Sequence, residues 1–313
     1  MEYLLLAFSV LLGACKSIVT KLARCPSGNL EGTAKINLIS FSCALIVLFF
    51  LGLGNFRAPF KVPVFLALIY AVCTFASQLC LMKAVETGSV SVSSLFYSCG
   101  FIIPTIWGNV YYKEGINLLH VFGILFIFAS FALSSRLKKD KDFKVGWLAA
   151  ALGGTLFSGL VGVVQKLFTT AYAGQSLDYF LYVAFGFIIV FNVALLFIAR
   201  LLRKTKKGAV PQNVTYGNVA ADKDSHLAAW SAKTIAFTVL LGAIIGLANK
   251  INTYLSGVLP SVIAFPVING GAILLSAILS RLIFKERLTR IQWSGIAAGI
   301  AGIVLLALGQ MYL

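Results

Sequence analysis

Tyr112-Lys113-Glu114 and Phe284-Lys285-Glu286 each close a long apolar segment of the chain, and the two triplets lie 172 residues apart. At the same offset, Tyr97 aligns with Asn269 without a gap. Each triplet is followed by a short polar stretch and a last apolar segment rich in small residues. An internal repeat in a membrane chain is typical of transporters whose substrate binds where the repeats meet.

Composition places nearly all of the chain in a lipid bilayer. Of the 313 residues, 59% are hydrophobic and 12% are charged, and the mean hydropathy is +0.94. The apolar runs are continuous rather than alternating, so they indicate helices and not the strands of a barrel. We therefore predict an all-α integral membrane protein with no separate soluble domain and ten transmembrane helices of ~20 residues. The predicted helices are 2–22, 35–54, 63–84, 90–112, 118–135, 146–172, 178–199, 234–256, 261–283 and 291–311.

Five helices per half is an odd number, so the second half must enter the membrane from the opposite side. The sequence thus predicts two inverted five-helix repeats, residues 1–140 and 141–313. Ser17-Ile-Val-Thr-Lys21-Leu22 matches Gly162-Val-Val-Gln-Lys166-Leu167 at the smaller offset of 145, so the halves must differ in length after their first helices. We expect residues 200–233 to form a long, polar and mobile loop.

The net charge of +16 would suggest nucleic acid as the partner of a soluble protein, but here the basic residues follow membrane topology and favour contact with lipid. Loops after the odd-numbered helices carry 20 Lys and Arg, and those after the even-numbered helices carry 3. This asymmetry predicts that the loops after the odd-numbered helices lie in the cytoplasm and that both termini lie outside.

One stretch near the C-terminus is more specific. It runs Pro266-Val-Ile-Asn-Gly-Gly-Ala-Ile-Leu-Leu-Ser276, then Phe284-Lys-Glu286, then Gln292-Trp-Ser-Gly295 and Gly299-Ile-Ala-Gly302. It resembles the last two helices of the drug/metabolite transporter superfamily in its ten-helix, EamA-type branch. The resemblance implies a central cavity lined by the first, third, fourth, sixth, eighth and ninth helices. It also implies termini inside, against the charge count, and leaves the substrate open.

Ionisable residues inside the membrane are the first candidates for a site. Lys16 stands among small residues, which favours an inward face, although a lysine six residues from a helix end can also reach the interface. Lys250 belongs to the polar run Asn249 to Tyr254, which must face protein or water. That run could line a substrate site or hold helices together. Lys21 and Lys166 correspond in the repeat, and either interfacial anchoring or a gate would explain them.

The predicted substrate-binding set takes one or more residues from each inward helix except the sixth, with Tyr97 and Asn269 equivalent by inversion. It comprises Lys16, Gln78, Tyr97, Asn249, Lys250, Asn252 and Asn269. Pro and Gly interrupt the backbone hydrogen bonding of helices and supply hinges. The predicted hinge or helix-break residues are Pro104, Pro266, Gly270 and Gly271.

All ten Asp and Glu lie in loops or at helix ends, whereas a pump for cationic drugs needs an acid at membrane depth. We therefore expect a secondary transporter of a small polar, anionic or zwitterionic metabolite in the plasma membrane, as an exporter or exchanger. The alternatives are efflux of cationic or amphipathic drugs, with an aromatic site from Tyr70, Tyr97, Trp107 and Tyr254, and a lipid enzyme. We expect no enzyme activity, cofactor, metal or nucleic acid, and a monomer or homodimer in contact with lipid.

Overall fold

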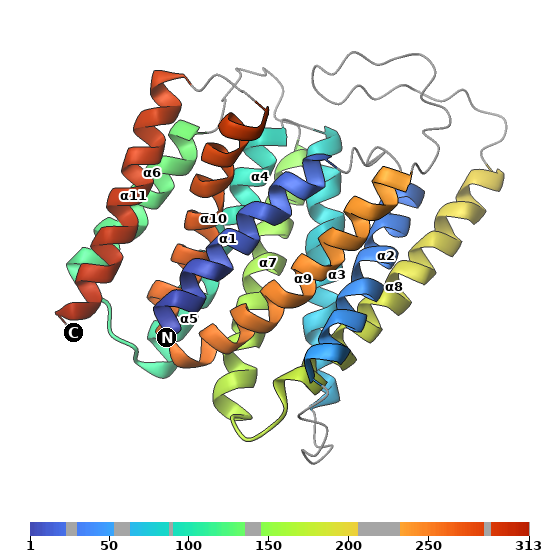
Figure 1. Ribbon diagram of the computed structural model, residues 1–313, viewed down its shortest axis with the longest axis horizontal. Coiled ribbons are helices and arrows are strands. Elements are labelled where there is room, and N and C mark those ends of the chain that lie inside the picture. The colour runs from blue at the N-terminus through green and yellow to red at the C-terminus, as the bar shows by residue number, and fades with distance from the viewer. Residues whose placement is uncertain are drawn as a thin grey trace.

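A computed structural model of the protein describes residues 1–22, 30–52, 63–87, 90–134, 145–205, 232–284 and 289–312. Every element in these ranges is a helix, and together they form one bundle (Figure 1). The helices are α1 (Glu2–Leu22), α2 (Leu30–Gly52), α3 (Val64–Thr87), α4 (Val90–Ser98), the short 3₁₀ helix η1 (Cys99–Phe101), α5 (Ile102–Tyr112), α6 (Leu118–Ser134), α7 (Val145–Ala171), α8 (Leu177–Thr205), α9 (Ala232–Val258), α10 (Ser261–Phe284) and α11 (Arg290–Met311).

The ten predicted spans are confirmed. Within the described ranges, eight helices are long and apolar enough to cross a membrane, and α6 is a shorter apolar helix. The fourth span is divided into α4, η1 and α5. The chain is therefore a multi-pass membrane protein of helices, as its continuous apolar runs predicted.

Two predicted boundaries are wrong. The second span begins at Leu30 rather than at residue 35, because its first turn is held by an ion pair between Glu31 and Lys35, one helical turn apart (2.8 Å). The seventh span continues to Thr205 rather than ending at residue 199. Residues 200–205 of the predicted loop are thus helical, and 206–231 lie outside the described residues.

The helix boundaries follow the 172-residue repeat. α5 ends at Tyr112 and α10 at Phe284, while α6 begins at Leu118 and α11 at Arg290. Packing follows the repeat as well: α1 lies against α9 and α10, and α7 lies against α3 and the α4–α5 span. The two remaining equivalent pairs, α2 with α8 and α6 with α11, pack on each other. The first helix of each half thus packs against helices of the other half.

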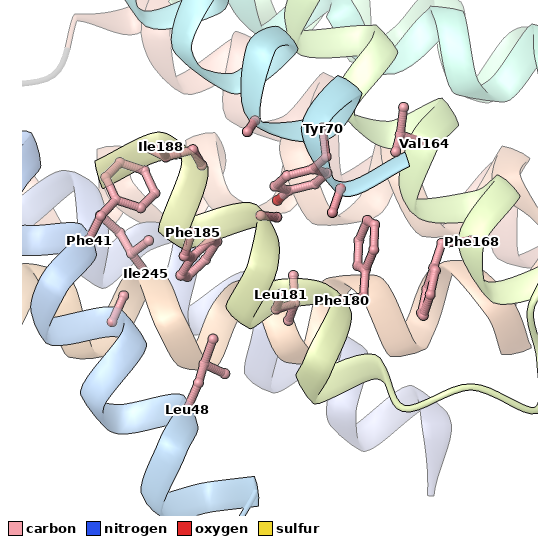
Figure 2. Close-up of a cluster of buried hydrophobic side chains, with 14 of the residues drawn as sticks. Phe41, Leu48, Tyr70, Val164, Phe168, Phe180, Leu181, Phe185, Ile188 and Ile245 are labelled. Carbon is pink, nitrogen blue, oxygen red and sulfur yellow. The ribbon is translucent and has the colours of Figure 1, made fainter. Parts of the chain in front are cut away.

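The largest buried cluster joins α2, α3, α7, α8 and α9 (Figure 2). Phe180 stacks on Phe168, with ring centroids 4.1 Å apart, and meets Tyr70 edge-on at 5.6 Å. Phe185 meets Phe41 edge-on at 5.3 Å. Since lipid is as apolar as these side chains, close packing rather than escape from water holds helices together in a bilayer. This cluster fixes α3, α7 and α9, which carry most of the polar side chains described below.

Both termini lie on one side of the bundle, together with the turns 113–117, 172–176 and 259–260 (Figure 1). We call this the termini side and the opposite side the loop side. At the termini side, residues 261–266 of α10 are all buried, whereas residues 275–280 near the loop side are all only half-buried. Six consecutive residues cover the whole circumference of a helix. The bundle therefore encloses α10 completely at the termini side and more loosely at the loop side.

Candidate functional site

Lys16 lies on the side of α1 that faces protein, yet its side chain is exposed. It follows Ser9 by seven residues, nearly two full turns, so both point the same way. Ser9 donates a hydrogen bond to Asn252 of α9, while the lipid-facing positions of α1 include Phe8 and Leu11. Among the described residues, Lys16 has no ion-pair partner. Within the part of the chain that the structure describes, it is an unpaired positive charge on the protein-facing side of α1.

Two of the predicted amides on α9 hold hydroxyl groups of other helices. Asn249 accepts a hydrogen bond of 2.7 Å from the hydroxyl of the buried Tyr70 on α3, and donates one of 2.8 Å to the carbonyl of Ile245. Asn252 accepts the hydrogen bond from Ser9. Both amides are half-buried and thus keep part of their polar surface available.

A second polar group lies on α3. Gln78 accepts a hydrogen bond of 2.9 Å from the amide of Asn37 on α2. One residue earlier, the buried Ser77 lies 3.4 Å from the hydroxyl of Tyr97 on α4. Successive residues of α3 therefore connect α2 on one side with α4 on the other.

The network continues toward the termini side. Gln165 of α7 donates a hydrogen bond of 3.1 Å to the hydroxyl of Thr253 on α9, and both are buried. Asn269 of α10 instead donates to the carbonyl of Phe265 in its own helix at 2.9 Å. The structure gives no contact between Asn269 and Tyr97, although the repeat aligns them.

Lys250 forms an ion pair with Asp178, the second residue of α8, at 2.7 Å between Nζ and Oδ1. The side chains are 27% and 7% exposed, respectively. Asp178 stands in the first turn of its helix, where the positive end of the helix dipole favours a carboxylate. Lys250 is therefore neutralised. Its partner Asp178 is buried although it lies at the end of a helix.

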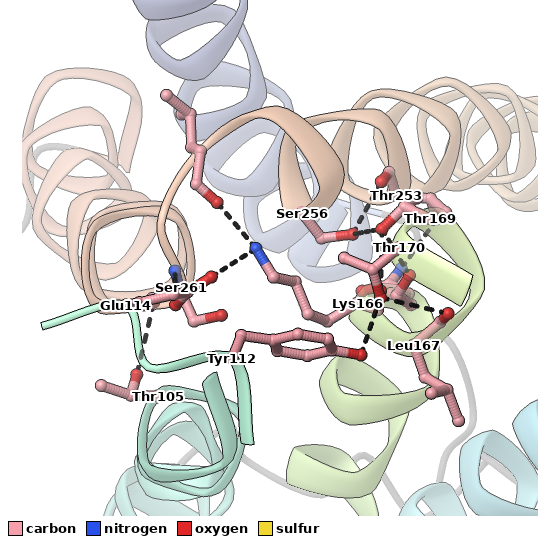
Figure 3. Close-up of polar contacts among 12 residues, drawn as sticks. Thr105, Tyr112, Glu114, Lys166, Leu167, Thr169, Thr170, Thr253, Ser256 and Ser261 are labelled. Carbon is pink, nitrogen blue, oxygen red and sulfur yellow. Dashed lines mark hydrogen bonds and ion pairs between the residues drawn. The ribbon is translucent and has the colours of Figure 1, made fainter. Parts of the chain in front are cut away.

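Lys166 is neutralised as well, at the termini side (Figure 3). Its Nζ lies 2.6 Å from Oε1 of Glu114, donates to the carbonyl of Leu259 at 3.2 Å, and stands 5.8 Å from the centre of the Tyr112 ring. The lysine side chain is 5% exposed and that of Glu114 is 13% exposed. The side chain of Lys21, its equivalent in the repeat, lies outside the described residues.

The predicted site residues thus share the interior without bonding to one another. Each one except Lys16 and Asn269 pairs with a side chain outside the predicted substrate-binding set. Those partners are Ser9, Asn37, Tyr70, Ser77 and Asp178, of which Tyr70 was considered only for an aromatic cation site. Glu114 was likewise not predicted as the partner of Lys166. A signal for the two acids was present, because a lysine buried in a membrane requires a neutralising group.

The hinge residues fall into two different settings. Pro104 lies in the first turn of α5, directly after η1, where the fourth span is broken. Pro266 lies inside a continuous α10 that also runs through Gly270 and Gly271. The two halves therefore differ at this point, and only the first half departs from α-helical geometry.

The aromatic residues considered for a cation site have their ring contacts elsewhere. Tyr70 packs on Phe180, and Trp107 stacks on Tyr111 with ring centroids 5.2 Å apart. Tyr254 is exposed on α9. No ring contact joins these residues to one another in the described ranges.

Comparison with known proteins agrees with the fold. Residues 1–136 match the EamA-like transporter family, which confirms the resemblance drawn from the sequence. Comparison with curated proteins found no match. Several solved structures are similar, among them a crystal structure of a protein that is 15% identical, with a TM-score of 0.70 over 99% of this chain and 98% of that chain. That likeness shows a shared fold over the full length.

These side chains carry the chemical groups that a small polar molecule would need as partners. Amide and hydroxyl groups on α3, α4 and α9 can accept or donate hydrogen bonds, and Lys16 can attract a negative group. Lys166 and Lys250 are already paired with acids.

Proposed function

Starting from the EamA-like match of residues 1–136, which indicates a membrane transporter of the drug/metabolite type, we propose a secondary transporter that works without ATP. It would move a small polar organic metabolite, anionic or zwitterionic, across the cytoplasmic membrane by alternating access. Export or exchange is the expected mode. The resemblance of the whole chain to a solved fold is consistent with this proposal but says nothing about the substrate.

The observation that supports an anionic substrate is the state of Lys16. A lysine within a membrane span costs ~3 kcal/mol on insertion scales, so it persists where water or a counter-charge can reach it. Lys166 and Lys250 each have a carboxylate beside them, whereas Lys16 has none among the described residues. A carboxylate, phosphate or sulfate group of the substrate would supply that missing charge.

A thermal-shift panel on purified protein tests the proposal, with organic and phosphorylated anions, amino acids, sugars, purines and cationic drugs. A ligand at 100 times its Kd stabilises the folded state by ~2.7 kcal/mol, which is readily measured. We expect anions or zwitterions to raise Tm, and Lys16→Met to remove the increase. Proteoliposomes loaded with a stabilising compound should then exchange it without ATP.

Lys83→Met is the matched control, because Lys83 is an exposed lysine near the end of α3 and outside the polar network. It should bind the same compounds as the unaltered protein. Stabilisation by cationic drugs alone would contradict the anionic site and favour multidrug efflux instead. Equal responses in Lys16→Met and the unaltered protein would remove Lys16 from the site.

A further inference from the structure

Glu114 is held in an unusual turn between α5 and α6. Its neighbours Lys113 and Gly115 both have positive φ, 53° and 71°. For a lysine, the left-handed conformation costs roughly 1–2 kcal/mol, so other contacts must retain it. The turn directs Glu114 away from its own half of the chain and toward α7 and α10 (Figure 3).

The carboxylate of Glu114 joins two elements of the second half. Oε1 pairs with Lys166 of α7, and Oε2 accepts a hydrogen bond of 2.7 Å from the backbone N–H of Ser261, the first residue of α10. The N-terminus of a helix favours a negative group, so this second contact is also charge-assisted. One side chain thus ties the α5–α6 turn to both α7 and the start of α10.

Neighbouring contacts extend the closure on the same side. Thr170 of α7 donates a hydrogen bond of 2.7 Å to the hydroxyl of Tyr112, the last residue of α5. Thr105 of α5 is buried, and its hydroxyl lies 3.4 Å from the carbonyl of Ser261. The first half therefore meets the second through polar contacts at the termini side, where α10 is fully enclosed.

A buried ion pair suits a contact that must both form and break. Its attraction is largely offset by the loss of hydration, so apolar side chains of similar volume would hold the closed state equally well or better. When the pair separates into water, each charge regains its hydration. The two arrangements can therefore differ little in free energy, as a reversible switch requires.

We propose that the Glu114–Lys166 pair, together with its contact to the start of α10, is the gate that closes the termini side during transport. The gate rests on the proposed transport function. It opens when the α5–α6 turn moves away from α7 and α10, so that both charges meet water. In this proposal the loop side, where residues 275–280 of α10 are only half-buried, is the open side.

Distances between spin labels at Leu118 and Gly174 test the gate in a chain whose six native cysteines are replaced. Leu118 is an exposed residue at the start of α6, and a side chain at Gly174 would meet open space in the turn after α7. The two labels therefore report on separation of the α5–α6 turn from α7 without disturbing packing. The measurement needs no substrate.

Glu114→Gln leaves Lys166 buried without its counter-charge, so a longer-distance population of at least about a tenth should appear. Lys166→Met should open the gate less, because Glu114 retains the N–H of Ser261. The double variant Glu114→Gln/Lys166→Met carries no charge, and we expect its distance to return to the closed value. The double variant should transport more slowly than the unaltered protein, because it has no charges that regain hydration when the gate opens.

Lys35→Met is the matched control, because it removes a lysine from an ion pair within α2, near the loop side. It should leave the distance unchanged. Identical distances in the unaltered protein, the two single variants and the double variant would overturn the gate. An open population in the double variant as large as that in the single variants would overturn it as well. If the distances behave as expected but no metabolite is carried, the transport function fails while the charge-controlled opening stands.

Discussion

At the scale of single residues, the pairing of Lys250 with Asp178 changes what a substitution should do. If Lys250 were a free substrate ligand, Lys250→Ala would lower affinity and leave folding intact. In the structure the substitution would strand a buried carboxylate, and removing one partner of such a pair costs on the order of 3 kcal/mol. We therefore expect Lys250→Ala to lower Tm clearly in detergent, measured by the fluorescence of native tryptophans.

The double variant Lys250→Met/Asp178→Asn tests the cause of that loss. It removes both charges and keeps similar volume, so most of the lost stability should return. Lys16→Met should cost far less, because no described acid depends on Lys16. A double variant no more stable than Lys250→Ala would show that packing, and not charge, explains the loss.

The sequence could identify the polar residues of the membrane spans but not their partners. Lys16, Lys250 and the amides of α9 stand out because they interrupt apolar segments. Their partners lie on helices far away in the chain, such as Asp178 for Lys250 and Glu114 for Lys166. Helix periodicity gives the direction in which a residue faces along one helix, but not which helix lies opposite. Tertiary packing alone decided these pairs.

At the scale of elements, glycines set how closely helices approach. A Cβ at Gly302 of α11 would lie 2.8 Å from the carbonyl oxygen of Gly123 on α6, and one at Gly123 would lie 2.9 Å from the oxygen of Gly302. A backbone carbonyl cannot move aside without moving its helix. Gly302→Ala should therefore separate α6 from α11 and cost ~1–3 kcal/mol, visible as a lower Tm.

Gly186→Ala is the matched control for this contact. Gly186 lies in α8, and its added Cβ would meet nothing within 4 Å, so Tm should stay the same or rise slightly. Because α6 and α11 pack chiefly on each other, transport by the folded fraction of Gly302→Ala should be nearly unchanged. An equal loss of stability in both variants would mean that helix propensity, and not close approach, is responsible.

Element positions were largely predictable, because the thickness of the bilayer sets the length of each span. The breaks at helix ends were predicted less well. The extension of α8 to Thr205 runs through a part of the sequence with basic residues, which hydropathy counts against a membrane span. The break at η1 is present in the fourth span and not in α10, although proline occurs in both. The local sequence therefore permits a break, and packing determines whether it forms.

At the scale of the whole molecule, the distribution of Lys and Arg and the internal repeat are both consistent with ten alternating membrane spans. The helix ends that flank the segments with 20 Lys and Arg lie on the loop side, and those that flank the segments with 3 lie on the termini side, as alternating spans require. The division between the halves, predicted at residues 140 and 141, falls in a segment outside the described residues and stays a prediction. The symmetric packing of α1 and α7 on the opposite halves supports the inverted repeat itself.

The direction of the molecule in the membrane is the last prediction. Positive loops are retained in the cytoplasm, so the termini side, with its Glu114–Lys166 pair, should face outward and the loosely packed loop side inward. Short epitope tags fused to Met1 and to Leu313 should both bind antibody on intact cells, before the membrane is permeabilised. Binding only after permeabilisation at both ends would reverse the orientation, and the pair would then close the cytoplasmic side. Tags on opposite sides would contradict the ten-span topology.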